Sequence, residues 1–189
     1  MTSPHRSPSW NNCQNNYRLI GIDPGSHQLG WGVIEWRDHR FRAIGAGVIR
    51  LQGSDLSKRL LLAEEAIEEA LQTYHPQVLV VEDVFHHRYP KATIHLAHVR
   101  GIVLLCAEKG GIKVFSYPPS VVKQTIGGRG NIGKEQLAKM VSTVLGLPTP
   151  LPPDAADALA LALTHAISLP TRHKMSFQKQ VEDCLLYTS

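Results

Sequence analysis

The chain has 189 residues, enough for one domain with a full hydrophobic core and too few for two large domains. Hydrophobic residues make up 43% of it and charged residues 19%, which excludes wholesale disorder, and no apolar stretch approaches the roughly 20 residues of a membrane-spanning helix. The net charge of +4 makes a polyanionic partner such as nucleic acid plausible, although a modest basic excess also occurs in proteins that never bind it.

The first 16 residues are rich in Ser, Pro and Asn and lack the apolar core of a secretory signal. We therefore predict a disordered leader over residues 1–16. The three cysteines, Cys13, Cys106 and Cys184, are an odd number without the spacing of a disulfide framework or a metal site. Their pattern favours a protein of the reducing cytoplasm.

Three short apolar segments then follow one another at hairpin-like spacing: YRLIGID, WGVIEWR and FRAIGAGVIRL. Turn residues separate them, which predicts three consecutive antiparallel strands. In residues 56–74, apolar side chains recur every three or four positions, which predicts an amphipathic helix. Its acidic residues fall largely on the opposite side, and we expect them to be a solvated face without chemistry: Glu64, Glu65, Glu68 and Glu69.

The nearly continuous apolar segment PQVLVVED follows a proline and predicts a strand covered on both faces. A helix is predicted over 91–109, with Gly101 marking a close approach to another element. IKVFSY reads as a last strand, PPSVVKQTIGG as a short helix with a glycine turn, and 134–146 as a further helix. The stretch LPPDAADALALALTH begins the final helix, with two prolines just before its first turn.

This order of elements predicts an α/β domain over residues 17–169, with a mixed five-stranded sheet flanked by helices. After it the pattern fades, and residues 170–189 are predicted to be a disordered tail. The closing CLLYTS resembles translated adapter sequence, so we assign the tail no function.

Four acids fall at the ends of predicted elements: Asp23 and Glu82 end strands, while Asp154 and Asp157 lie three apart on one helix face. Taken singly, each has an ordinary explanation as a turn, strand-end or helix-start residue. Residues just past strand ends, however, line the ligand crevice of an α/β sheet. Four acids gathered there would repel one another unless a cation lay between them, and hard oxygen ligands suit Mg²⁺ or Mn²⁺.

Two such ions about 3.5–4 Å apart can promote water attack and stabilise the leaving oxygen in phosphodiester cleavage, which predicts a nuclease. The small apolar body of the final helix would pack it tightly on the sheet, so that its first turn delivers two carboxylates. The residues expected to make this contact are Ala155, Ala158, Leu159, Ala162 and Leu163.

Four blocks of the sequence resemble the RuvC family of Holliday-junction resolvases: GIDPGS, VVEDVF, VKQTIGG and DAADALALALTH. They occur in the family's order between Arg18 and His165. The resemblance implies an RNase H-like fold, a homodimer, and Mg²⁺-dependent cutting of two strands of like polarity at a four-way DNA junction. It also suggests a branch-migration complex resembling RuvA and RuvB as a partner.

Carried over position by position, the resemblance implies that the four acids are catalytic and bind two Mg²⁺ ions, for which Mn²⁺ can substitute: Asp23, Glu82, Asp154 and Asp157. Some relatives have histidine at the place of Asp154. Lys123 in VKQ and Lys134 in GKEQ match catalytic lysines of the family, which would contact the scissile phosphate or stabilise the charge of the transition state.

On the DNA side, Phe85 resembles an aromatic side chain that stacks on bases at the opened junction centre. Arg88 and Lys91, with neighbouring histidines, form a basic patch suited to phosphates. Here the chain departs from the family, because HHRYPKATIHLAHVRG replaces a segment that often contains an Asn and GQARG, which affects DNA contacts and the dimer surface. Zinc is a less favoured explanation of the histidines, since no cysteines accompany them: His86, His87, His95 and His98.

Three other functions are weighed against this one. GIDPGS also resembles the phosphate loop of actin-like and sugar-kinase ATPases, but those folds need a duplicated domain with a second loop, for which the chain has no room. A nonenzymatic DNA-binding module is disfavoured because acids near a phosphate backbone weaken binding without a metal. A nuclease of the same fold acting on RNA or on RNA–DNA hybrids stays open.

Overall fold

The structure is a computed structural model, and it describes most of the predicted domain. The described residues are 17–37, 40–53, 55–83, 90–128, 130–147 and 151–169, without the side chains of 90–93. The predicted leader over 1–16 and tail over 170–189 lie outside them.

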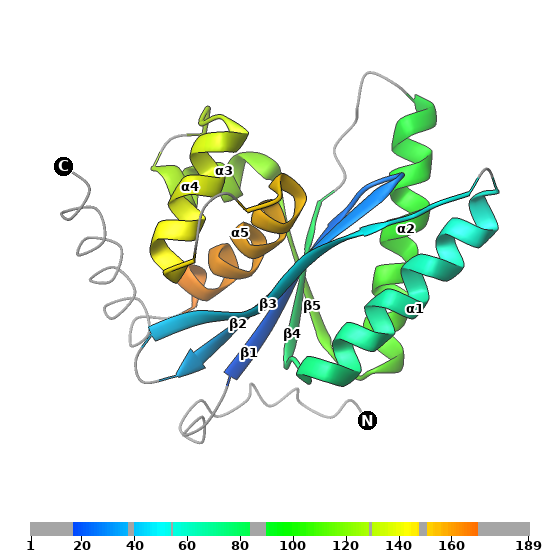
Figure 1. Cartoon of the computed structure of the whole chain (residues 1–189), viewed down its shortest axis with the longest axis horizontal. Coiled ribbons are helices and arrows are strands. Elements are labelled where there is room, and N and C mark those ends of the chain that lie inside the picture. The colour runs from blue at the N-terminus through cyan, green and yellow to red at the C-terminus, as the bar shows by residue number, and fades with distance from the viewer. Residues whose placement is uncertain are drawn as a thin grey trace, which may run out of the picture.

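A mixed sheet of five strands forms the centre of the fold (Figure 1). Its order is β3-β2-β1-β4-β5, in which β1, β2 and β3 are antiparallel neighbours and β4 and β5 continue parallel to β1. The predicted antiparallel start and the mixed five-stranded sheet are confirmed. The strands are β1 (Tyr17–Pro24), β2 (Gln28–Arg37), β3 (Arg40–Arg50), β4 (Val78–Glu82) and β5 (Lys113–Tyr117).

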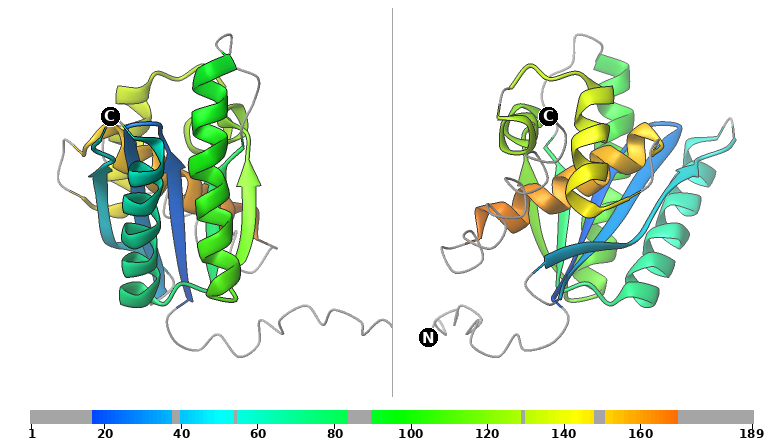
Figure 2. Two further views of the ribbon diagram at one scale, coloured as in Figure 1. Left: turned by 90° about the vertical axis from the view of Figure 1, so that its right-hand side faces the viewer. Right: turned by 60° about the vertical axis from the view of Figure 1, so that its left-hand side comes forward.

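Helices cover both faces of the sheet (Figure 2). The helices α1 and α2 pack on one face, and α3, α4 and α5 pack on the other, which confirms the predicted sheet flanked by helices. Among the described residues, we find no helix long and apolar enough to cross a membrane. The helices are α1 (Leu56–Tyr74), α2 (Pro90–Lys109), α3 (Pro119–Gly127), α4 (Lys134–Leu145) and α5 (Pro153–Ser168).

Alternate residues of the central strands supply two separate hydrophobic cores. In β1, Leu19 packs with the core under α3, α4 and α5, whereas Ile20 packs with the core under α1 and α2. This follows from the period of two in strand side chains. In β4, residues 78–81 are all buried, which confirms the predicted strand covered on both faces.

Glycines in the sheet let α5 lie directly on the strands. A Cβ at Gly21 would overlap the Ala158 carbonyl oxygen, and a Cβ at Gly30 would overlap the Asp154 carbonyl oxygen. The predicted tight packing of the final helix is confirmed, and its Ala155, Ala158 and Leu159 are buried. The close approach predicted at Gly101 is wrong, because a Cβ at this exposed position of α2 would meet nothing within 4 Å.

Candidate active site

Three aspartates meet where β1 ends and α5 begins. Asp23 is the penultimate residue of β1, while Asp154 lies in the first turn of α5 and Asp157 follows three residues later on the same helix face. Each of the three offers a carboxylate oxygen, and these oxygens lie within 4.8 Å of one another. The register explains the meeting, because Asp23 pairs with Gly30 of β2, where the missing side chain leaves room for the Asp154 main chain.

The start of α5 leaves the acids available for another role. Its N-cap is Pro152, without a side-chain cap hydrogen bond, and the Ala156 N–H donates to the Pro152 carbonyl oxygen. Asp154 and Asp157 therefore follow the cap instead of forming it. Asp154, in the first turn, still places negative charge at the favourable end of the helix dipole.

Glu82 is the last residue of β4 and lies beside Asp23 at the ends of neighbouring strands. Ile22 pairs with Val81 in the parallel ladder, so the two acids are the next residues along β1 and β4. Glu82 is the nearby charge that raises the pKa of Asp23 most. It lies outside the group of three aspartates whose oxygens fall within 4.8 Å of one another.

The electrostatics of the site centre on Asp23. Burial first, and then the charges of Glu82, Asp157 and Asp154, raise its pKa to about 7, although the charge of Lys134 acts in the opposite direction. Near neutral pH the buried carboxyl thus competes with its acidic neighbours for ionisation. A bound cation would remove this conflict, and the donors are the hard oxygens that Mg²⁺ and Mn²⁺ prefer.

The two predicted catalytic lysines differ in their relation to the acids. Lys134 is the first residue of α4, and its Nζ lies 3.2 Å from Asp157 Oδ2. The charge of Asp157 raises the pKa of Lys134, whose side chain is nevertheless 68% exposed. Lys123 lies half-buried on α3. Of the two lysines, Lys134 forms an ion pair with one of the aspartates.

The predicted DNA-binding residues cannot be placed in the same way. Phe85 and Arg88 lie outside the described residues, as do His86 and His87 of the zinc alternative. Lys91 lies in the first turn of α2, but its side chain is not among those described. Their roles stay predictions.

Arg100 of α2 is a neighbour of the site that the sequence analysis missed. Its guanidinium Nη2 donates to Ser116 Oγ at 2.8 Å, and its Nε donates to the Glu82 carbonyl oxygen at 3.4 Å. Nη2 also lies 3.7 Å from Asp83 Oδ1. The sequence offers no periodic signal for these contacts, because α2 and the ends of β4 and β5 meet only through the fold.

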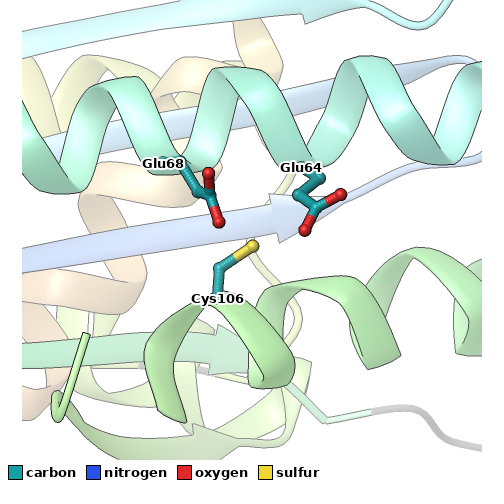
Figure 3. Close-up of side chains that lie close together, drawn as sticks. All are labelled: Glu64, Glu68 and Cys106. Carbon is teal, nitrogen blue, oxygen red and sulfur yellow. The ribbon is translucent and has the colours of Figure 1, made fainter. Parts of the chain in front are cut away.

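A second group with metal-ligand geometry lies between α1 and α2: Glu64, Glu68 and Cys106 (Figure 3). Here Lys109 Nζ already lies 2.7 Å from Glu64 Oε1 and 2.6 Å from Glu68 Oε1. Burial raises the pKa of the Cys106 thiol to about 11, so the thiol is protonated at neutral pH and is a weak ligand. We interpret this group as an ion-pair cluster between helices.

This cluster corrects one prediction about α1. Glu64 and Glu68 are half-buried and pair with Lys109, because α2 packs along this side of α1. The prediction that they belong to a solvated face is therefore wrong. Glu65 and Glu69 are exposed, as predicted.

Comparisons with known proteins identify the family of this chain. The profile of crossover junction endodeoxyribonuclease RuvC matches residues 19–165, which include all four acids and both lysines. The chain belongs to the RuvC family. A RuvC of Caldanaerobacter subterraneus is 39% identical over 153 residues, covering 80% of this chain and 93% of that protein. A RuvC of Ruegeria pomeroyi is 40% identical over 149 residues, covering 79% and 90%.

A solved RuvC structure agrees in fold as well. The T. thermophilus RuvC in complex with Holliday junction substrate aligns with a TM-score of 0.75 and 34% identity. The alignment covers 80% of this chain and 94% of the T. thermophilus RuvC chain. The RNase H-like architecture implied by the resemblance is thus confirmed.

Proposed function

We propose that this RuvC-family protein is a Holliday junction resolvase, an endonuclease that makes paired nicks in strands of like polarity at a four-way DNA junction. The observation that carries the proposal is the meeting of Asp23, Asp154 and Asp157 beside Glu82 at one end of the sheet. The T. thermophilus relative bound to a Holliday junction substrate supports the choice of substrate.

We assign the metal site to these four carboxylates and expect it to take two Mg²⁺ ions, with Mn²⁺ as a substitute. Asp23, Asp154 and Asp157 offer hard oxygen ligands within 4.8 Å of one another, and Glu82 adds negative charge beside them. Bound divalent ions would supply charge stabilisation to the phosphate and assist attack by water. The raised pKa of Asp23 supports this assignment, because burial and the charges of Glu82, Asp157 and Asp154 all disfavour its ionised form, and a divalent cation would offset them.

The protein's own groups would orient and neutralise the DNA strand. Lys134 is exposed and reaches Asp157, so its ammonium lies where a scissile phosphate would approach the acids. Lys123 is proposed for the same phosphate from the resemblance alone. We propose that Phe85 stacks on junction bases and that Arg88 and Lys91 bind phosphates.

We further propose that the protein acts as a homodimer, since paired nicks need two active sites. On α2, Ile94 and Leu105 are 53% and 50% exposed, and Gly101 lies between them on the same helix face. This apolar helix face can contact a second copy of the chain, and the absence of a side chain at Gly101 leaves room for the second copy to approach closely. We also propose that a RuvA-RuvB-like complex is a partner of this protein. We propose a cytoplasmic location as well, and the buried free thiol of Cys106 is compatible with it.

The dimer surface is tested with Leu105→Glu in sedimentation equilibrium. The variant should shift the protein toward monomer, because a charge in an apolar contact is poorly tolerated. Leu61→Glu is the matched control, since Leu61 is 53% exposed on α1 instead of α2. An unchanged dimer for Leu105→Glu would place the contact on another surface.

The function is tested by incubating the protein in Mg²⁺ with a synthetic four-way junction, a linear duplex and an RNA–DNA hybrid. Paired nicks placed symmetrically in the junction are the expected result. Cutting of the hybrid alone would refute the proposal in favour of the RNA-directed nuclease. Tight junction binding without cutting at any divalent metal concentration would favour the nonenzymatic module.

A further inference from the structure

Arg100 links the helix layer to the strand end that carries Glu82. Its guanidinium contacts three neighbouring points: the Glu82 carbonyl oxygen, the Asp83 carboxylate and the Ser116 hydroxyl. All three lie at the ends of β4 and β5. We propose that Arg100 is a positioning residue for the cleavage reaction, which holds Glu82 in place beside the aspartates. This inference rests on the proposed function, in which Glu82 helps to bind the metal.

The need for such a contact follows from how β4 ends. The ladder between β1 and β4 closes with Ile22 opposite Val81, one residue before Glu82. On the other side, Glu82 pairs with Tyr117, and the Asp83 N–H donates to the Tyr117 carbonyl oxygen at 2.9 Å. Pairing with β5 therefore fixes the main chain at Glu82 on one side. The hydrogen bond from Arg100 of α2 to the Glu82 carbonyl oxygen is a second interaction that fixes it.

The form of the contact suits an indirect role. Arg100 Nε contacts the main chain of Glu82, and its Nη2 binds Ser116, which pairs with Val81 in the ladder. Asp83 supplies a carboxylate 3.7 Å from the guanidinium. A planar guanidinium can serve several acceptors at once in fixed directions, which a lysine ammonium cannot do equally well. Arg100 therefore acts on the metal site through the backbone position of Glu82.

A purely structural role would have a different signature. Only 23% of the Arg100 side chain is exposed, so its removal can lower stability whether or not it positions Glu82. A structural role alone would lower Tm and leave metal affinity unchanged well below Tm. A positioning role weakens metal binding in the folded protein, because partners that orient metal ligands typically contribute about 10–100-fold in affinity or activity.

The test compares Arg100→Gln, Arg100→Lys and Ser116→Ala with the full-length wild type. Mn²⁺ affinity without DNA is measured by calorimetry at a temperature where every variant is folded, and Tm is recorded for each. Hydrogen exchange at the Asp83 amide reports the fixation of the strand end directly. The control is Lys58→Gln, which removes an exposed cation from α1, the other helix on this face of the sheet.

For Arg100→Gln we expect Mn²⁺ affinity to fall about tenfold or more and the Asp83 amide to exchange faster. Arg100→Lys should recover part of the loss. Ser116→Ala should lie between Arg100→Gln and wild type, and Lys58→Gln should match wild type. Mn²⁺ affinity of Arg100→Gln within twofold of wild type would overturn the inference. This outcome is distinct from failure of the proposed function, in which wild type binds Mn²⁺ but leaves the junction uncut.

Discussion

Two acidic groups in this protein satisfy the same proximity criterion and behave differently. In each, three potential ligand atoms lie within 4.8 Å of one another: Asp23, Asp154 and Asp157 in one group, Glu64, Glu68 and Cys106 in the other. In the second, Lys109 already contacts both glutamates. In the first, the exposed Lys134 reaches Asp157 alone, and burial with neighbouring charge raises the pKa of Asp23 to about 7.

The difference shows that proximity of carboxylates does not by itself identify a metal site. The residual charge and the nature of the donors decide the matter. The helix-to-helix group contains its own cation and a thiol whose pKa is raised to about 11, so little negative charge is left for a metal. The strand-end group consists of hard oxygen donors with excess negative charge, which is the condition that a divalent cation relieves.

The largest expected effect is the loss of junction cleavage when an acid of the strand-end group, but not of the helix-to-helix group, is replaced. Asp157→Asn should reduce junction cleavage at least about a hundredfold, because it removes a charged ligand from the site. Asp23→Asn and Glu82→Gln should do the same while junction binding persists. Glu68→Gln, the matched control from the other group, should stay within about twofold of wild type. Single-turnover nicking of a labelled junction measures the rates, and full activity in Asp157→Asn would remove that residue from the site.

The next effect concerns the two lysines. Lys134→Met should lower cleavage yet tighten Mn²⁺ binding a few-fold, because the ammonium now beside Asp157 competes with a metal for the same carboxylate. Lys58→Met, which removes an exposed lysine of α1 instead, should leave Mn²⁺ affinity unchanged. Calorimetric titration with Mn²⁺ measures both. Weaker Mn²⁺ binding by Lys134→Met would mean that the lysine supports the metal site instead of opposing it.

The pH dependence of stability should also differ between the groups, through Asp23. Its pKa is about 7 in the folded protein against an ordinary 3.8, so between these values the folded state holds a proton that the unfolded state has released. In metal-free buffer, the free energy of unfolding should therefore fall as pH rises, by about 2 kcal/mol from pH 5 to pH 7. Urea denaturation at several pH values measures it.

The control for that series is Asp23→Asn, which should lose this slope. His165 acts in the opposite direction, because burial lowers its pKa from 6.5 to about 4 and stability then falls as pH decreases through this interval. His165 is present in both proteins, so its contribution cancels in their difference. An identical pH profile for wild type and Asp23→Asn would contradict the raised pKa.

The smallest expected effect lies in the ion-pair cluster. Glu64→Gln with Glu68→Gln should lower Tm by only about a few degrees, since ion pairs with an exposed lysine contribute little. The difference should shrink in high salt, because mobile ions screen such pairs. Thermal unfolding at low and high ionic strength checks this. A large, salt-independent loss would show that the glutamates have a packing role instead.

Much of the fold was predictable because its signals are local. The alternation and spacing of apolar residues gave the strand and helix order, and turn residues marked the boundaries. Contacts between distant segments were less accessible. Gly101 looked like a packing contact from its position in an apolar helix, yet it faces open space, and Glu64 looked solvated until α2 was placed beside α1.

The sequence alone determined which elements form and which acids end them, since short-range periodicity and the four matching blocks are written in consecutive residues. Only the tertiary structure decided that Gly30 admits the Asp154 main chain and that Arg100 reaches the end of β4. The physical reason is that these contacts depend on how the helices pack on the sheet. Packing brings together residues that are far apart in the sequence, and their spacing along the chain does not predict the contact.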